Sequence, residues 1–240
     1  MNEENKNLLE KYPFLKLRSV WTSEMLDDES ESDDETWLDA LEEGWKIRFG
    51  IPFIEDLNEV LTKNNCVNDY QIIQVKEKWG QLRWYDYGAP EEWDDHMNAW
   101  EYISEHTCKK CGKFPVPMRD DGWISPWCDE CFGSWRKVPY TDEEKEKYTC
   151  PEFDTNRLLE YLTIRKWNKD FTESYYIDLK PYYKKIGFTD FSNLITREEM
   201  AQYDDYVEAL NKFKKINNLH YIKDSEIIPL EIQHMSPFKK

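Results

Sequence analysis

The sequence predicts an α+β fold with a small hairpin-and-helix domain at its N-terminus, a short cysteine-rich insertion and a mainly helical C-terminal region. The insertion is marked by two Cys-x-x-Cys pairs with sixteen residues between them. Two β-rich runs joined by a short Gly-containing link precede it and predict an antiparallel hairpin. Helix-period apolar patterns and two capping boxes follow it. We expect domains at 1–107, 108–137 and 138–240.

The chain has 240 residues, of which 40% are hydrophobic and 15% aromatic. This composition suffices for a packed core, in one large domain or two small ones, and excludes a chain that is disordered throughout. No apolar run approaches the roughly 18 residues of a membrane span, and the N-terminus has no signal-peptide pattern. We therefore expect no membrane partner and a cytoplasmic location, where cysteines serve as metal ligands or free thiols rather than disulfides.

The formal net charge of −17 is unevenly spread along the chain. Residues 1–107 carry 26 acidic and 10 basic residues, a net of −16, whereas 108–140 is net +2 and 141–240 is net −3. Such an acidic surface repels nucleic acid and disfavours broad binding to it. It suits a protein partner with a basic surface, and it also favours solubility.

The N-terminal half is expected to begin with a short helix that Tyr12-Pro13-Phe14 ends, followed by a loop, two further helices and one hairpin. Residues 24–35 hold eight acidic side chains in twelve positions, which predicts a solvated loop. Apolar residues from Trp37 predict a short helix that Gly44 ends, and a longer amphipathic helix follows, ending near Asn64. The β-rich runs place the hairpin over 70–87.

Helices are expected in most of the remaining chain. Pro90 opens a helix that runs into the first cysteine pair. A capping box over 141–144 starts a short helix, and leucines predict another from about 155–167. A helix is expected over 180–187, between a proline and a glycine, and the clearest one begins at the capping box of 196–199.

The two cysteine pairs predict a metal site. Asp121-Gly122 between them is a hairpin-turn signal, and two knuckles around a hairpin form a zinc ribbon. Four thiolates close a tetrahedral shell and leave no position for water, so we expect one structural Zn²⁺ per chain. Cys66 and Cys150 are expected to be small, partly buried side chains outside the site. The expected ligands are Cys108, Cys111, Cys128 and Cys131.

The cysteine segment is also the only net-basic part of the chain, and its cations alternate with tryptophans. One interpretation is a nucleic-acid patch that stacks on bases and grips phosphates, above all through Lys109, Lys110 and Arg136. The other, which we prefer, is that the cations offset the thiolate charge and the tryptophans pack. The residues concerned are Lys109, Lys110, Lys113, Arg119, Arg136 and Lys137, with Trp123, Trp127 and Trp135.

The hairpin carries a second mixture of cations and aromatic rings, over 76–85. This block either binds an acidic partner or ligand, or is held together by cation–π and ion-pair packing. The two interpretations remain open at this point.

Catalytic signatures are scarce. The chain has no phosphate-binding glycine loop, dinucleotide fingerprint or Gly-x-Ser-x-Gly motif. Glu92 and His96 are four residues apart on one expected helix, and Asp94 and Asp95 adjoin them. A metal-dependent hydrolase can be imagined from these residues, but acidic helix starts are common for dipole reasons alone. His106 is expected to be a helix-end residue, and we assign no catalytic residue.

An ordered series of motifs resembles a widespread family of uncharacterised bacterial and phage proteins. The series runs from Gly44-Trp45 through VKEKWGQLRWY at 75–85 and CKKCGK at 108–113 to Gly122-Trp123 and the second cysteine pair. The family block usually has the form VKEKFGxLRFY and precedes a Cys-x-x-Cys-Gly. The resemblance covers about residues 37–132. It implies a bacterial or phage source and a shared fold unit, and it implies no activity.

Three functions from different classes remain open. The leading hypothesis is a non-enzymatic, zinc-stabilised interaction protein, such as an inhibitor, immunity or anti-defence protein whose acidic surface occupies a basic partner. The second is nucleic-acid binding through the zinc ribbon. The third is a metal-dependent hydrolase that uses His96. The expected location is the cytoplasm of a bacterial cell, or of the host if the chain is phage-encoded.

Overall fold

The computed structural model describes residues 3–17, 35–120, 122–135, 141–144 and 162–192, and also residues 194, 196–198, 201–202, 204–205 and 208. These residues form helices and small antiparallel sheets, so the fold is α+β. Most of the acidic run at 24–35, Asp121, Arg136, Lys137 and Cys150 lie outside the described residues.

The chain divides into two compact units, which are described separately. The first comprises Met1–Leu159 with Pro181–Thr189, and the second Glu160–Lys180 with Asp190–Lys240. The expected domain limits at 107 and 137 remain predictions. No local sequence signal indicated that Pro181–Thr189 would belong to the first unit.

Short helices lead into the first long helix. Residues 43–63 form an unbroken helical run in which a π-helical turn joins two α-helices. The elements are α1 (Glu3–Lys11), η1 (Pro13–Leu15), η3 (Trp37–Ala40), α2 (Glu43–Trp45), the π-helix η4 (Lys46–Gly50) and α3 (Ile51–Lys63).

The prediction that Gly44 ends a helix is wrong. The residues from Trp37 form only a 3-10 turn, and Gly44 lies inside α2. The predicted end of the next helix is confirmed, because Asn64 caps α3. Gly44 is needed for another reason, which concerns the metal centre.

The predicted hairpin is present. Strands β1 (Gln71–Lys78) and β2 (Gln81–Tyr87) pair antiparallel, and the tight turn between them places Trp79 and Gly80 at positive φ. One face of the hairpin is buried and carries Ile72, Val75, Leu82 and Trp84.

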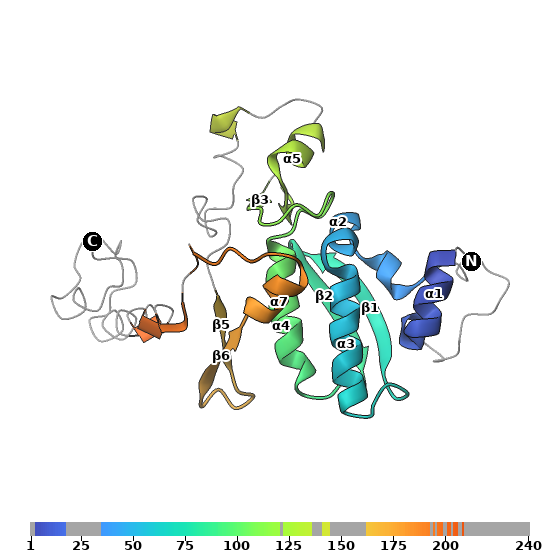
Figure 1. The fold of residues 1–240 in the computed structure, drawn as a ribbon. Helices are drawn as coiled ribbons and strands as arrows, with labels where there is room; N and C mark the ends of the chain where they lie inside the picture. Colours follow the sequence, from blue (N-terminus) through green and yellow to red (C-terminus); the bar gives the residue numbers. More distant parts are fainter. Residues whose placement is uncertain are drawn as a thin grey trace. The chain divides into compact units, whose positions relative to one another are not determined.

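The core of the first unit lies where the hairpin meets α3 and α4 (Trp93–Glu105), which run side by side (Figure 1). Phe53 of α3 contacts three indole rings, with centroid distances of 4.7 Å to Trp84, 5.5 Å to Trp93 and 5.8 Å to Trp100. Burying such large rings supplies much of the hydrophobic stabilisation of a domain.

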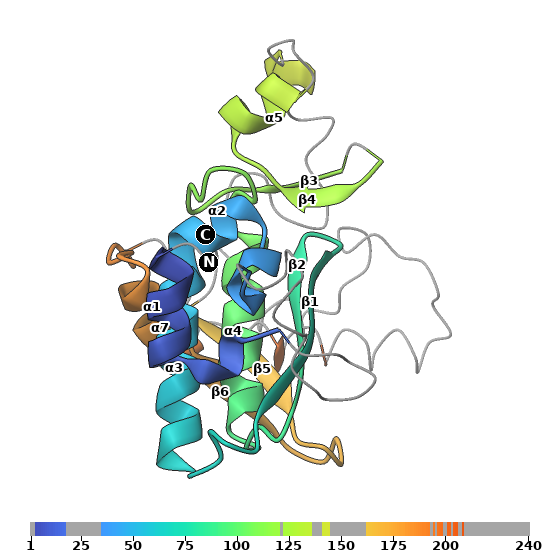
Figure 2. The same ribbon diagram turned by 90° about the vertical axis from the view of Figure 1, so that its right-hand side faces the viewer.

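The cysteine segment forms a second, shorter hairpin. Strands β3 (Met118–Asp120) and β4 (Ile124–Pro126) pair antiparallel, and α5 (Asp129–Trp135) follows. Figure 2 shows this hairpin next to the turn of β1–β2. The contact is close, since a Cβ on Gly80 would lie 2.2 Å from Met118 Cε.

The described part of the second unit contains a hairpin where a helix was predicted. Strands β5 (Thr163–Trp167) and β6 (Ser174–Asp178) pair antiparallel, so the expectation of a helix up to Trp167 is wrong there. The run Thr163–Trp167 begins with two β-branched residues and ends with an aromatic one, which favour a strand once a partner strand is available. Residues 155–161 of the predicted helix lie outside the described residues.

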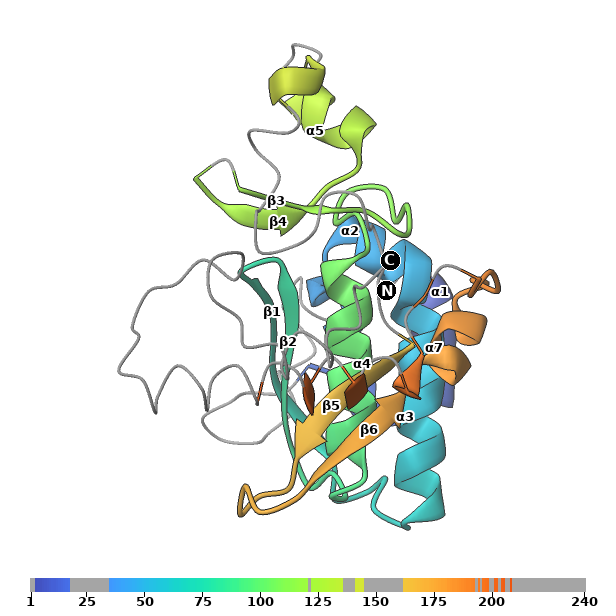
Figure 3. The ribbon, with the colours of Figure 1, turned by 90° about the vertical axis from the view of Figure 1, so that its left-hand side faces the viewer.

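Other predicted helical segments are present among the described residues. Helix α7 (Lys180–Lys185) matches the prediction over 180–187, and its residues from Pro181 on pack against α3 and α4 (Figure 3). The described residues 197–198, 201–202, 204–205 and 208 are helical. The capping box at 141–144 is formed, because Thr141 and Glu144 exchange hydrogen bonds between side chain and backbone.

Glu105 at the end of α4 should make stability depend on pH. Burial and the like charge of Glu101 raise the pKa of Glu105 from 4.5 to about 7. A carboxyl group with a raised pKa contributes stability to the folded state below pH 4.5. This contribution is lost as the pH rises through about 7. Glu105→Gln, which can still bond Gln81, should therefore raise the free energy of unfolding by about 2 kcal/mol at pH 8 and change it little at pH 5. Denaturant unfolding at both pH values measures this, and an equal effect at both would contradict it.

Candidate metal centre and aromatic hollow

The first cysteine pair is held by the residues that start the long helical run. Gly44 N donates to Lys109 O over 2.7 Å, and Trp45 Nε1 donates to Thr107 O over 3.0 Å. Arg48 Nε donates to Gly112 O over 2.6 Å. A Cβ on Gly44 would lie 2.1 Å from Cys108 O, so only glycine allows the backbones to approach this closely.

The four predicted ligands come together. The sulfur atoms of Cys108, Cys111, Cys128 and Cys131 all lie within 4.8 Å of one another. The distance between the sulfurs of Cys111 and Cys128 is 3.7 Å. A tetrahedron with metal–sulfur bonds of about 2.3 Å has edges of about 3.8 Å, so the donor set and its spacing fit a four-coordinate metal ion.

In the absence of a metal ion, burial disfavours the ionised form of two of these thiols. Burial raises the pKa of the Cys128 thiol to about 11, and the pKa of Cys131 is raised too, chiefly by burial. Thiolates are the metal-binding form, and a metal ion promotes their formation. Among the described residues, this is the group of His, Cys, Asp and Glu side chains that could hold a metal ion.

Cys66 and His106 have the positions expected of them. The Cys66 thiol lies outside the cluster, half-buried, and contacts Leu61 O at 3.5 Å. His106 caps the end of α4, and its Nδ1 lies 2.9 Å from Tyr102 O. Burial lowers the pKa of His106 to about 4.

Three cations in the described part of the cysteine segment are engaged within the protein. Arg119 is buried and forms an ion pair with Asp129. Lys110 pairs with Glu43 at the surface. Lys109 Nζ donates to Ser125 Oγ over 3.1 Å and lies 5.0 Å from the ring centre of Trp127. Phosphate binding requires cations that are not already engaged within the protein. The contacts of these three residues therefore weaken the nucleic-acid interpretation.

The tryptophans of the segment differ from expectation, because two of them do not pack. The side chains of Trp123 and Trp135 are 63% and 59% exposed. They border a cavity of about 170 Å³, which we call the aromatic hollow, lined by Lys109, Trp123, Ser125, Trp127, Phe132 and Trp135. Exposed indoles around a hollow are typical of an interaction site.

In the cationic-aromatic block of the hairpin, at 76–85, two lysines lie over aromatic rings of the same block. Lys76 Nζ lies 5.0 Å from the Tyr85 ring centre, and Lys78 Nζ lies 4.4 Å from that of Trp79. The cation–π interpretation is thus confirmed for these pairs. Trp79 nevertheless remains 64% exposed at the turn.

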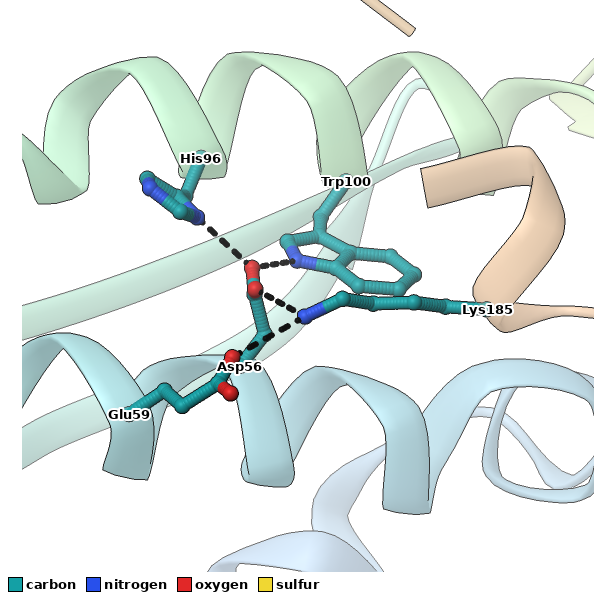
Figure 4. Close-up of polar contacts among 5 residues, drawn as sticks. All are labelled: Asp56, Glu59, His96, Trp100 and Lys185. Atoms are coloured by element: carbon teal, nitrogen blue, oxygen red, sulfur yellow. Dashed lines mark hydrogen bonds and ion pairs between the residues drawn. The ribbon is translucent and has the colours of Figure 1, made fainter. Parts of the chain in front are cut away.

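His96 pairs with a residue that the sequence did not single out. Its Nδ1 lies 2.8 Å from Oδ2 of Asp56, which also accepts a hydrogen bond from Trp100 Nε1 over 2.8 Å (Figure 4). Lys185 forms an ion pair with Oδ1 of the same carboxylate and a longer one, of 3.4 Å, with Glu59.

The partners of Glu92 are residues other than His96. It accepts hydrogen bonds from Lys63 Nζ over 2.7 Å and from Asn64 Nδ2 over 2.5 Å. Glu92 and His96 form no hydrogen bond or ion pair with each other in the described part of the chain, although the charge of His96 contributes to lowering the pKa of Glu92 after the hydrogen bonds from Lys63 and Asn64. The one available signal for Asp56 was an acidic residue on the apolar side of an amphipathic helix, next to Leu57.

None of the helices in the described part of the chain is long and apolar enough to cross a membrane. No family model matches the chain, and no curated protein or solved structure shows detectable similarity to it.

Proposed function

We propose that the four-cysteine centre holds one structural zinc ion in a zinc ribbon. An all-sulfur donor set favours zinc among the common divalent ions, and four protein ligands leave no position for a reacting water. The ion would stabilise residues 108–135, which have only a small apolar core. Its buried residues are Cys108, Val116, Met118, Cys128 and Phe132, with Trp127 and Cys131 packed against the cysteine cluster. A segment this small needs such a cross-link to hold its side chains in place.

We propose further that the protein is a non-enzymatic interaction protein, and that it binds a partner protein through the segment that the metal stabilises. The observation that carries this is the exposure of Trp123 and Trp135 around the aromatic hollow. Tryptophan is strongly enriched among the residues that dominate binding energy at protein interfaces. Trp79 is also exposed, at the adjacent turn of the β1–β2 hairpin.

The net charge of −17 makes a protein with a basic surface the best-matched partner. An inhibitor, immunity or anti-defence protein that covers a basic, nucleic-acid-binding surface has this character. Direct nucleic-acid binding is less well supported, because Lys110 and Arg119 are paired with carboxylates.

The proposal predicts a partner whose binding depends on both tryptophans. Full-length protein would be used to capture a partner from nuclease-treated bacterial lysate, and the partner would then be purified and titrated. We expect Trp123→Ala with Trp135→Ala to weaken binding at least about tenfold, because both indoles lose their contact area. Binding should also weaken as salt rises, since opposite charges attract the partner.

Trp167→Ala is the matched control, because Trp167 is an exposed tryptophan of the second unit. It should leave the affinity unchanged. Equal binding by the double variant and the wild type, or capture of nucleic acid alone, would overturn the proposal.

A further inference from the structure

The aromatic hollow is a receptor of defined chemistry rather than a featureless apolar patch. Its walls are the rings of Trp123, Trp127, Phe132 and Trp135, and its polar groups are the ammonium of Lys109 and the hydroxyl of Ser125. Ser125 is fully buried, so its hydroxyl is a fixed part of the wall.

Lys109 shows that this hollow already accommodates a cation. Its ammonium lies 5.0 Å from the ring centre of Trp127, at a distance typical of cation–π contacts. Trp123 and Trp135 remain more than half exposed. The hollow thus has one cation at its wall and two exposed indoles at its rim.

A carboxyl group at the rim offsets the charge of Lys109. Glu77 Oε2 accepts a hydrogen bond from Trp123 Nε1 over 3.2 Å. Burial raises the pKa of Glu42, on which the charges of Lys109 and Glu77 also act, so Glu42 is not counted as a charge at the hollow. Lys110, the next cation along the chain, is neutralised by Glu43. A carboxylate beside an exposed indole favours a cationic occupant over an anionic one.

We propose that the aromatic hollow receives an arginine side chain of the partner protein. A guanidinium is planar, stacks on indole faces and carries five donors in a fixed fork. The faces of Trp123 and Trp135 provide the stacking surface, and Glu77 provides a carboxylate at the edge of Trp123. The inference rests on the proposed function, because it names the group through which a basic partner would enter this site.

The main competing occupant is a nucleobase, which also stacks on tryptophan. The charge of Lys109 separates the two. It repels a guanidinium, whereas it attracts a phosphate or an acceptor atom of a base. Removing this charge therefore changes the affinity in opposite directions for the two occupants.

The test uses the full chain, with the indole N–H signals of the hollow followed by NMR. The probes are a short blocked glycine-serine peptide with one arginine, the same peptide with citrulline, and thymidine monophosphate. Citrulline has the shape of arginine without its charge. We expect the arginine peptide to shift the signals of Trp123 and Trp135 and the citrulline peptide to bind about fivefold more weakly or worse.

Lys109→Met is the decisive variant, because it keeps an unbranched apolar stem and removes the charge. It should strengthen binding of the arginine peptide about threefold or more, as expected for removing a like charge several ångströms away. Lys113→Met is the matched control, since Lys113 is exposed and does not line the hollow. It should change the affinity less than twofold. Metal content and thermal unfolding show whether each variant is folded.

Equal binding of the arginine and citrulline peptides would overturn the inference. So would weaker arginine binding by Lys109→Met, or tighter binding of thymidine monophosphate than of the arginine peptide. A partner that requires Trp123 and Trp135 but tolerates loss of its arginines would keep the proposed function and remove only this inference.

Discussion

Cys128→Ser is expected to abolish metal binding and to unfold residues 108–135. Cys128 is buried, and it joins the second cysteine pair to the first through its sulfur contact with Cys111. Structural zinc contributes about 10–16 kcal/mol of apparent binding free energy in isolated zinc fingers, and this is folding free energy for a segment with little core. Metal analysis should fall from about one ion per chain to near none after dialysis against a chelator.

Hydrogen exchange provides the local measurement. The amides of Cys131 and Phe132 bond to the sulfur and carbonyl of Cys128, so their protection should be lost with the metal. Cys66→Ser is the matched control, because Cys66 lies outside the cluster. It should retain the full metal content. A Cys128→Ser protein that keeps both its metal and its amide protection would contradict a structural centre.

Asp56→Asn should give the largest loss of stability away from the metal. The side chain of Asp56 is only 3% exposed, and it compensates the charge of Lys185. The change weakens the charge-assisted hydrogen bonds of this buried carboxylate, while Lys185 keeps Glu59 and some solvent contact, so we expect a loss of roughly 1.5–3 kcal/mol. Chemical denaturation of the full chain would show this as a lower midpoint with an unchanged slope.

The pH dependence has a definite sign. Burial alone would raise the pKa of Asp56, but hydrogen bonds from His96, Lys185 and Trp100 hold it below its usual value of 3.8. Its stabilising contribution is therefore present above pH 3.8 and is lost as the pH falls through the lowered value. Asp56→Asn should lose this acid-dependent step.

Glu59→Gln is the control for Asp56. Glu59 contacts the same lysine at 3.4 Å, but its side chain is 79% exposed. Surface ion pairs contribute roughly 0–1 kcal/mol, so this variant should differ little from wild type. Equal effects of the two variants would show that Asp56 is not the buried anchor of α7.

Local signals in the sequence were sufficient for several features. The spacing of the cysteines predicted which four sulfurs gather, because two residues between cysteines place both side chains at one turn. The β-rich runs predicted β1–β2, and the end of α3 followed from its amphipathic pattern. In each case the signal and the structure lie within a few residues of each other.

Features that depend on distant partners could not be predicted. Thr163–Trp167 is a strand because it pairs with Ser174–Asp178, although the leucines before it are spaced as in a helix. Gly44 resembled a helix stop, yet its lack of a side chain serves the approach to Cys108. Both outcomes depend on a partner segment that local periodicity does not identify.

The sequence by itself determined the α+β class, the four clustered sulfurs and the acidic charge of this protein. Only the tertiary structure decided that Asp56 meets Lys185, 129 residues away, and that Trp123 and Trp135 stay exposed around a hollow. The reason is physical. Residue type and spacing are local properties, whereas burial and charge pairing depend on which distant surfaces the fold brings together.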